Sequence, residues 1–235
     1  MPASPGSSCP PLRTWGEGDR TVLLVHGLSS ASTSFVRLGP ALAARGYRVL
    51  APDLPGHGRS SRLESYTLGA EADALAAAAP GPYTVAVGHS LGGRLLFMAR
   101  DRIRAARYVY LDPAWGPAPD ESVAAGLRAQ TRWDLDTLAA ANPRWHPDAL
   151  AAKLAALRRW DTATLDASLG SPGVTPEPAD APSLVLLADP SLTVPDALAR
   201  RLPGLGYTVR TVPGAGHVLH HDDLDGTLRG MADWL

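Results

Sequence analysis

The sequence predicts an α/β fold: a doubly wound, mostly parallel sheet with a helical lid inserted between two strands. Two observations predict it. Short apolar runs rich in β-branched residues alternate with helical stretches, as in βαβ units whose strands are buried on both faces. The alternation then fails once, over residues 113–182, where the sequence has no convincing strand. A length of 235 residues suits one such α/β unit.

Six strands and three helices make up the alternating part. The predicted strands are 21–25, 47–51, 83–87, 106–111, 183–188 and 207–212. The predicted helices are 38–45, which ends at Gly46, 68–79, which ends at Pro80, and 91–104. Because parallel strands need crossover connections, these helices are expected to cover both faces of the sheet.

The segment 113–182 reads as three or four helices, with breaks at Asn142-Pro143 and His146-Pro147. We therefore predict a flexible N-terminal tail (1–10), a core (11–112 and 183–235) and a helical cap (113–182). The alternative is a helical layer that only covers the sheet edge. Four of the six tryptophans lie in this segment and suggest an apolar pocket or simple packing onto the sheet: Trp115, Trp133, Trp145 and Trp160.

Composition excludes several classes of protein. The formal charge is −1, from 22 basic and 23 acidic residues, which argues against a nucleic-acid or membrane-surface partner. A single cysteine, Cys9, cannot form an intramolecular disulfide. We expect a cytoplasmic protein with no membrane span. We also expect no cofactor, since Gly16-Glu17-Gly18 does not continue into a dinucleotide fingerprint. Lys153 is the only lysine, which we attribute to genome composition. The oligomeric state stays open.

The segment 88–93, Gly-His-Ser-Leu-Gly-Gly, fits the pattern Gly-x-Ser-x-Gly. It follows a predicted strand directly and opens a predicted helix, which is the context of a nucleophile elbow. The glycines allow a sharp turn that lifts the Ser90 hydroxyl above the sheet edge. The alternative is a glycine-rich helix start in which Ser90 only caps.

Three further motifs lie at the carboxyl ends of predicted strands, where ligands bind in open α/β sheets. At 25–28, the N–H groups of Leu28 and of Leu91 could form an oxyanion hole, while His26 is expected to shape the loop by hydrogen bonding. At 53–60, Asp53 and His57 could form an acid–base pair, but a rigid structural loop is the preferred interpretation.

The third motif, Pro-Gly-Ala-Gly-His at 213–217, places His217 on a loop that could reach a nucleophile on another strand. His220 and His221 raise the possibility of a metal site, but no glutamate lies between them and we expect no metal. Asp222, Asp223 and Asp225 are expected to start the C-terminal helix.

In this order the motifs resemble the α/β-hydrolase superfamily, from about residue 12 to 235, and in particular its small capped esterases, carbon–carbon hydrolases and cofactor-free haloperoxidases. The resemblance implies Ser90 as nucleophile, His217 as base and a carboxylate between them in the chain. The family's usual acid position, four residues before Pro195, is Ser191. Asp189 is therefore the preferred acid and Asp112 the alternative.

The leading functional hypothesis is hydrolysis of a small carboxylic ester or thioester through an acyl-enzyme on Ser90. One alternative is a carbon–carbon bond hydrolase or lyase that uses the same triad on an acidic substrate. Its cations could come from five arginines that we interpret as solvated helix faces: Arg94, Arg132, Arg144, Arg158 and Arg159. The other alternative is a non-catalytic ligand-binding protein on a hydrolase fold.

Overall fold

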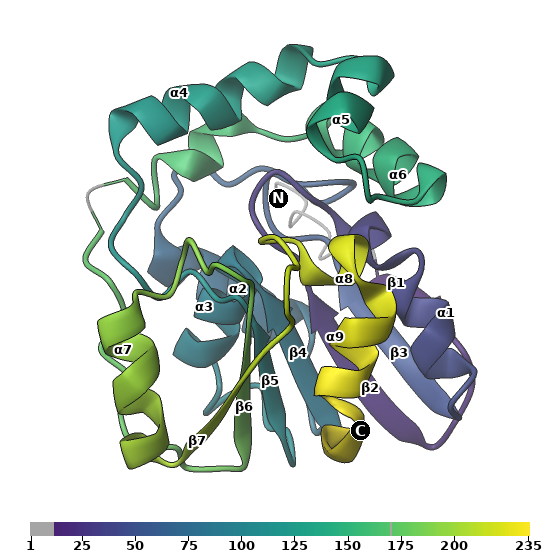
Figure 1. Ribbon diagram of the computed structural model, residues 1–235, viewed down its shortest axis with the longest axis vertical. Helices are drawn as coiled ribbons and strands as arrows, with labels where there is room; N and C mark the ends of the chain where they lie inside the picture. Colours follow the sequence, from purple (N-terminus) through teal and green to yellow (C-terminus); the bar gives the residue numbers. More distant parts are fainter. Residues whose placement is uncertain (1–11, 170) are drawn as a thin grey trace, which may run out of the picture.

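The computed structural model describes residues 12–169 and 171–235, and a seven-stranded sheet forms its centre (Figure 1). The predicted tail at 1–10 lies outside the described residues. The order across the sheet is β1-β3-β2-β4-β5-β6-β7, with β1 antiparallel to β3 and every other neighbouring pair parallel. The strands are β1 (Leu12–Trp15), β2 (Arg20–Val25), β3 (Tyr47–Pro52), β4 (Val85–His89), β5 (Tyr108–Leu111), β6 (Ser183–Leu187) and β7 (Tyr207–Thr211).

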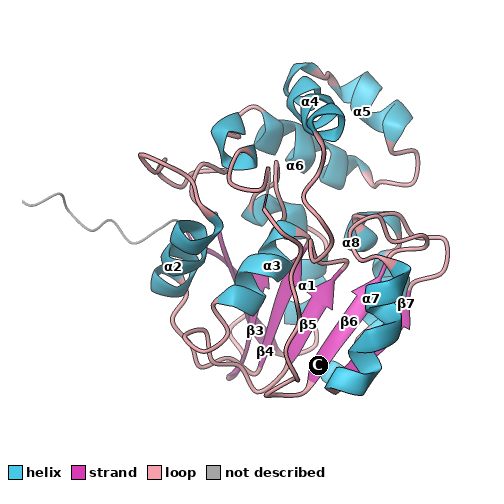
Figure 2. Ribbon diagram, turned by 90° about the vertical axis from the view of Figure 1, so that its left-hand side faces the viewer, coloured by secondary structure: helices cyan, strands magenta, loops and turns pink. Residues whose placement is uncertain are grey.

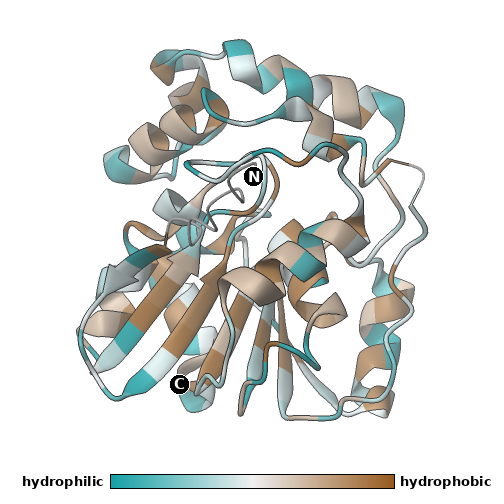
Figure 3. Ribbon diagram, turned by 180° about the vertical axis from the view of Figure 1, so that it is seen from behind, coloured by the Kyte–Doolittle hydropathy of each residue, from teal (hydrophilic) through white to brown (hydrophobic). Residues whose placement is uncertain are grey.

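Strand side chains alternate between two hydrophobic layers. In β2, Val22 and Leu24 pack on one face and Leu23 and Val25 on the other, all fully buried. One layer is covered by α2 (Leu68–Ala78), α3 (Leu91–Met98) and α7 (Asp196–Arg201), and the other by α1 (Leu38–Ala43), α8 (Leu219–Asp222) and α9 (Leu224–Gly230) (Figure 1; Figure 2 shows α2, α3 and α7 from the side). Apolar strands between two helical layers, brown in Figure 3, confirm the doubly wound α/β prediction.

The structure differs from the sequence prediction in several elements, among them α7, which was not predicted, and β5, which begins at Tyr108 and not at 106. The short edge strand β1 was missed. The strand expected at 83–87 begins at Val85 and runs to His89, with Tyr83 forming an isolated bridge to Ala105. The helix expected at 91–104 ends at Met98, because the chain beyond it is held by Tyr108 instead. The Tyr108 hydroxyl lies 2.9 Å from the carbonyl oxygen of Arg100 and 2.8 Å from that of Ile103.

Between β5 and β6 the chain leaves the sheet and forms α4 (Glu121–Ala129), α5 (Leu135–Ala141) and α6 (Pro147–Leu157). These helices lie above the carboxyl ends of the strands (Figure 1). The predicted breaks hold, since α5 ends before Asn142 and α6 begins at Pro147. The segment has small apolar clusters of its own, around Trp160 and around Trp145, whereas Trp115 is buried in the main core.

None of the helices in the described ranges combines the length and apolar character that a membrane crossing requires.

Candidate active site

Ser90 sits in a sharp turn between β4 and α3. Its backbone has φ 51° and ψ −120°, a conformation that non-glycine residues rarely adopt. The turn is possible because glycines surround it. A Cβ on Gly92 would lie 2.4 Å from the carbonyl oxygens of both Val25 and His26, so only glycine fits there. The sharp strand-to-helix turn expected from the sequence is therefore present.

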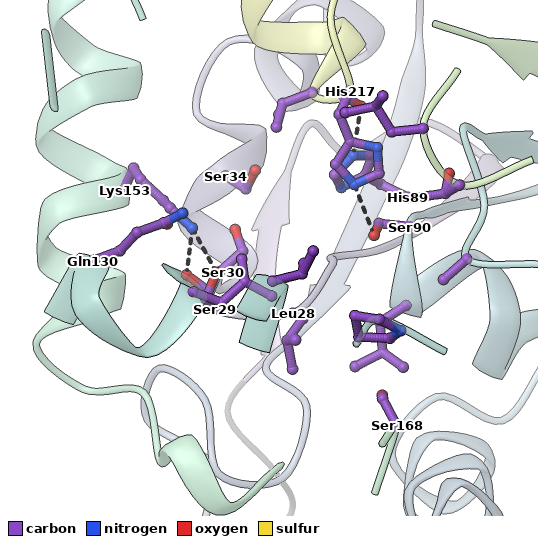
Figure 4. A pocket seen from close by; sticks show the side chains of 18 of the residues that line it. Leu28, Ser29, Ser30, Ser34, His89, Ser90, Gln130, Lys153, Ser168 and His217 are labelled. Atoms are coloured by element: carbon purple, nitrogen blue, oxygen red, sulfur yellow. Dashed lines mark hydrogen bonds between the residues drawn. The ribbon is translucent and has the colours of Figure 1, made fainter. Parts of the chain in front are cut away.

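His217 connects Ser90 to Asp112. Its Nε2 lies 2.9 Å from Ser90 Oγ (Figure 4). Its Nδ1 lies 2.7 Å from Asp112 Oδ2. Because an ionised carboxylate can only accept, Nδ1–H donates to Asp112 and Nε2 is left to accept the Ser90 hydroxyl proton. The arrangement can remove a proton from Ser90 and stabilise the imidazolium that results.

Asp112 follows β5 directly and its side chain has no exposed surface. Burial disfavours the ionised form, but hydrogen bonds from His217, Ser191 and the Ala188 N–H, with the charge of His217, hold the pKa of this carboxyl below its usual value. The Ala188 N–H donates to Oδ1 at 3.2 Å, and the Thr193 hydroxyl lies 3.1 Å from Oδ2. Asp112 is therefore a fixed anion behind His217.

The preference for Asp189 over Asp112 is corrected by this geometry. Asp189 is exposed, and its carboxylate accepts from the Gly214 N–H at 3.0 Å instead of facing His217. The strand order explains the difference. β5 lies beside β4, which carries Ser90, whereas β6, which precedes Asp189, lies one strand further away.

His89 holds the loop that carries His217. Its Nε2 donates to the His217 carbonyl oxygen at 3.0 Å. Burial, with His217 and His220 close by, keeps the pKa of His89 well below its usual value, so the ring is neutral. The sequence motif contained His89 but gave no indication of this contact, which joins positions 128 residues apart.

Leu28 and Leu91, the residues expected to form an oxyanion hole, both line the cavity next to Ser90. Leu91 is the first residue of α3, so its N–H has no partner within the helix. The His26 ring donates from Nδ1 to the Gly27 carbonyl oxygen at 2.8 Å and accepts from the Leu54 N–H at 3.0 Å. His26 thus shapes the loop, as expected.

The loop after β3 has the structural role that the sequence favoured. Asp53 accepts from the N–H groups of Ser32 at 2.7 Å and Arg59 at 3.0 Å. His57 donates to the Pro55 carbonyl oxygen at 2.9 Å and accepts from the Ser29 N–H at 3.3 Å. Burial and the neighbouring His26 lower the pKa of His57 to about 3. Both side chains are therefore occupied in holding backbone groups.

His220 and His221 both point their Nε2 atoms at the Ser34 hydroxyl, at 2.9 and 3.1 Å. Across residues 12–169 and 171–235, no group of three or more His, Cys, Asp or Glu side chains is placed to hold a metal ion. Asp223 caps α9 by accepting from the Gly226 N–H at 2.7 Å, as expected for an acid at this helix start. Asp222 instead pairs with Arg144 at 3.4 Å.

Ser90 and His217 open into a cavity of about 780 Å³ between the sheet and α4–α6. Its walls are mostly apolar and include Trp133 and Trp145. Arg94 was interpreted as part of a solvated helix face, which is wrong, since it is 7% exposed and lines the cavity. The other four arginines of that set are exposed. Lys153, which was attributed to genome composition, also lines the cavity.

Comparison with known proteins places these features in a family. A sequence model of the alpha/beta hydrolase family matches residues 22–229. A probable esterase of Oryza sativa is 38% identical over 104 residues, which are 40% of this chain and 39% of that protein. The pimeloyl-[acyl-carrier protein] methyl ester esterase of Chromobacterium violaceum is 39% identical over 106 residues, 43% of this chain and 41% of that protein. The matches thus cover about two fifths of each curated relative.

Among solved structures, an N-formylmaleamic acid deformylase from Pseudomonas putida S16 superposes with a TM-score of 0.77. It is 22% identical, and the superposition covers 94% of each chain. At this identity the likeness establishes the fold alone.

Proposed function

The chain belongs to the alpha/beta hydrolase family, and we propose that it is a serine hydrolase that cleaves small carboxylic esters or thioesters. The observation that carries the proposal is the unbroken contact series Ser90–His217–Asp112, whose first two members line the cavity. Relatives named as esterases support the same reaction class. The cytoplasmic location and the absence of a nucleic-acid partner stay predictions from the sequence.

In the proposed reaction, His217 takes the Ser90 proton as Ser90 Oγ bonds to the substrate carbonyl carbon. The N–H groups of Leu28 and Leu91 stabilise the oxyanion, each contributing roughly a hundredfold or more in rate. The imidazolium then protonates the leaving alcohol or thiol as its bond to the carbonyl carbon breaks. Water, activated by the same ring, releases the acid and restores Ser90. Asp112 orients the ring throughout.

The segment with α4–α6 is proposed to act as a cap that walls the reaction off from water, while 12–112 and 183–235 form the core. Its position over the carboxyl ends of the strands supports this division (Figure 2).

A carbon–carbon hydrolase on the same triad is the second candidate. The observation in its favour is Arg94, buried in the cavity wall where it could face an acidic substrate. Turnover of a panel of ring-cleavage products, with no turnover of esters, would select it. A purely ligand-binding role loses its main argument, the uncertain acid, because Asp112 lies against His217.

The test is labelling with a fluorophosphonate, read by intact mass. We expect one adduct on wild type, none on Ser90→Ala, and normal labelling of Ser168→Ala, which changes another serine in the cavity wall. An adduct that persists on Ser90→Ala, or none on folded wild type, would refute the proposal.

A further inference from the structure

The cavity contains two cationic side chains, and none of the described residues that line it is aspartate or glutamate. Lys153 enters from α6 and Arg94 from α3. Across residues 12–169 and 171–235, neither has a carboxylate oxygen within 4.0 Å, whereas Arg100 on the surface pairs with both Glu177 and Asp180. Holding a cation away from bulk water with no opposite charge beside it costs free energy, and an anionic ligand would offset that cost.

The Lys153 ammonium has a defined position. It donates to the Ser29 carbonyl oxygen at 2.9 Å and to the Ser29 hydroxyl at 2.7 Å (Figure 4). An ammonium group has three donors, so one more is available to a ligand in the cavity. Ser29 itself is held in a left-handed conformation, with φ 56°, directly after Leu28. The cation is thus attached to the loop that is proposed to hold the oxyanion.

The charge of Lys153 acts on three histidines: His26 and His57 from the loops after β2 and β3, and His221 from α8. Burial lowers the pKa of all three, so they are neutral at neutral pH. Burial also lowers the pKa of Lys153, to about 8, which leaves it cationic at neutral pH.

We propose that the substrate carries a carboxylate at a distance from the scissile bond, and that Lys153 binds this carboxylate. The inference rests on the proposed function, because it names the class of ester that the Ser90 site takes. Arg94 contributes further positive charge; its Nη2 donates to the Pro172 carbonyl oxygen at 2.5 Å, and its buried Nε has no partner among the described residues.

The competing role for Lys153 is a tether that only fastens α6 to the Ser29 loop. Removal of a tether would lower activity on charged and neutral substrates alike. Removal of a carboxylate ligand would lower activity on charged substrates alone. The two roles are therefore separated by substrates that differ only in the carboxylate.

The experiment compares kcat/KM for monomethyl adipate and methyl hexanoate, which have the same chain length with and without a carboxylate. The monomethyl esters of succinate, glutarate and pimelate are added because they vary the distance between the ester carbonyl and the carboxylate. We expect wild type to prefer an acidic ester at one of these lengths by about ten- to a hundredfold. Lys153→Met should lose at least about tenfold on that ester, through KM, and change less than about threefold on methyl hexanoate.

Two controls accompany this variant. Lys153→Arg keeps the charge and should keep most of the preference, and Arg159→Met removes an exposed charge of the same segment without effect.

In wild type the preference should fall as the pH rises through about 8, where the ammonium loses its proton, and Lys153→Met should not show this fall. A neutral ester preferred at every length, or equal losses on both ester types, would overturn the proposal.

A binding measurement keeps this result distinct from failure of the proposed function. Monomethyl adipate titrated into Ser90→Ala by calorimetry should bind at least about tenfold tighter than into Ser90→Ala/Lys153→Met. If no ester is turned over but this difference is found, the carboxylate site stands and the esterase proposal fails. If esters are hydrolysed and the two variants bind monomethyl adipate equally, the esterase proposal stands and the carboxylate site fails.

Discussion

Asp112 and His217 are 105 residues apart in the chain, and their side chains meet at 2.7 Å. The contact depends on the sheet, since β5 delivers the carboxylate beside the strand that delivers Ser90 and the loop after β7 brings His217 over both. Fixing Nδ1–H against a buried anion leaves Nε2 as the acceptor that a serine nucleophile requires.

Asp112→Asn should therefore remove most of the activity, by about a thousandfold or more in kcat, because the amide carries no charge and can favour the wrong histidine tautomer. Asp189→Asn is the matched comparison and should stay within about threefold, since within the described part of the chain this carboxylate accepts from the Gly214 N–H and does not contact His217. Steady-state hydrolysis of a neutral ester measures both. A larger loss in Asp189→Asn than in Asp112→Asn would contradict the assignment.

Gly92→Ala should destabilise the protein by several kcal/mol, about the range of severe overpacking, because both contacts of the added Cβ are backbone atoms that cannot rotate away. Gly126→Ala in α4 is the control, since no described atom beyond its chain neighbours and the backbone of its own helix lies within 4 Å of its added Cβ. This second change should stabilise by up to about 1 kcal/mol. Urea unfolding reports both, and equal stability of the two variants would show that the elbow can relax.

Acid should unfold the protein through its buried histidines. Burial lowers the pKa of His57 and of His221 to about 3, so folding favours their neutral forms. This stability is complete above the unfolded value near 6.5 and is lost as the pH falls towards 3. His57→Gln, which can keep both hydrogen bonds, should show a shallower fall of Tm between pH 6 and 4. Above pH 7 the Tm of this variant should change with pH as the Tm of wild type does. A Tm difference from wild type that is the same at every pH would contradict the prediction.

Alkali should destabilise the protein through the buried carboxyl of Glu71. Burial raises its pKa to about 8, and neither carboxyl oxygen has a hydrogen-bond partner among the described residues. The stability of the neutral acid is complete below about pH 4.5 and is lost as the pH rises through 8. Glu71→Gln should be more stable than wild type above pH 8, by about 2–4 kcal/mol at most. Exposed Glu64→Gln is the control, and an advantage independent of pH would refute the mechanism.

The central strands were predictable because their evidence is local. A strand buried on both faces needs an unbroken apolar run, which β2 and β6 show in the chain itself. β1 offers no such run, as its four residues alternate between exposed and half-buried, and its position depends on pairing with β3. The end of α3 is equally non-local, since no glycine or proline marks it and Tyr108 takes the carbonyl oxygens beyond.

The residues of the candidate site also divide into those with local sequence evidence and those that depend on contacts between distant parts of the chain. Ser90 and His217 lie in glycine-rich motifs whose sequence constrains the backbone, so both could be named in advance. The acid could not, because Asp112 and Asp189 each follow a strand and only the order of strands across the sheet separates them. Arg94 was assigned to a solvated face and Lys153 to genome composition, because the sequence of a helix alone does not say which side chain faces a cavity.

The bonds between Lys153 and Ser29 couple two parts of the molecule that would otherwise move separately. Any displacement of α6 that widens the cavity must break them, and Ser29 directly follows Leu28 in the chain. Opening the site in this way to exchange substrate and product would separate Lys153 from the Ser29 loop. The contacts among Ser90, His217 and Asp112 involve neither residue and would stay in place.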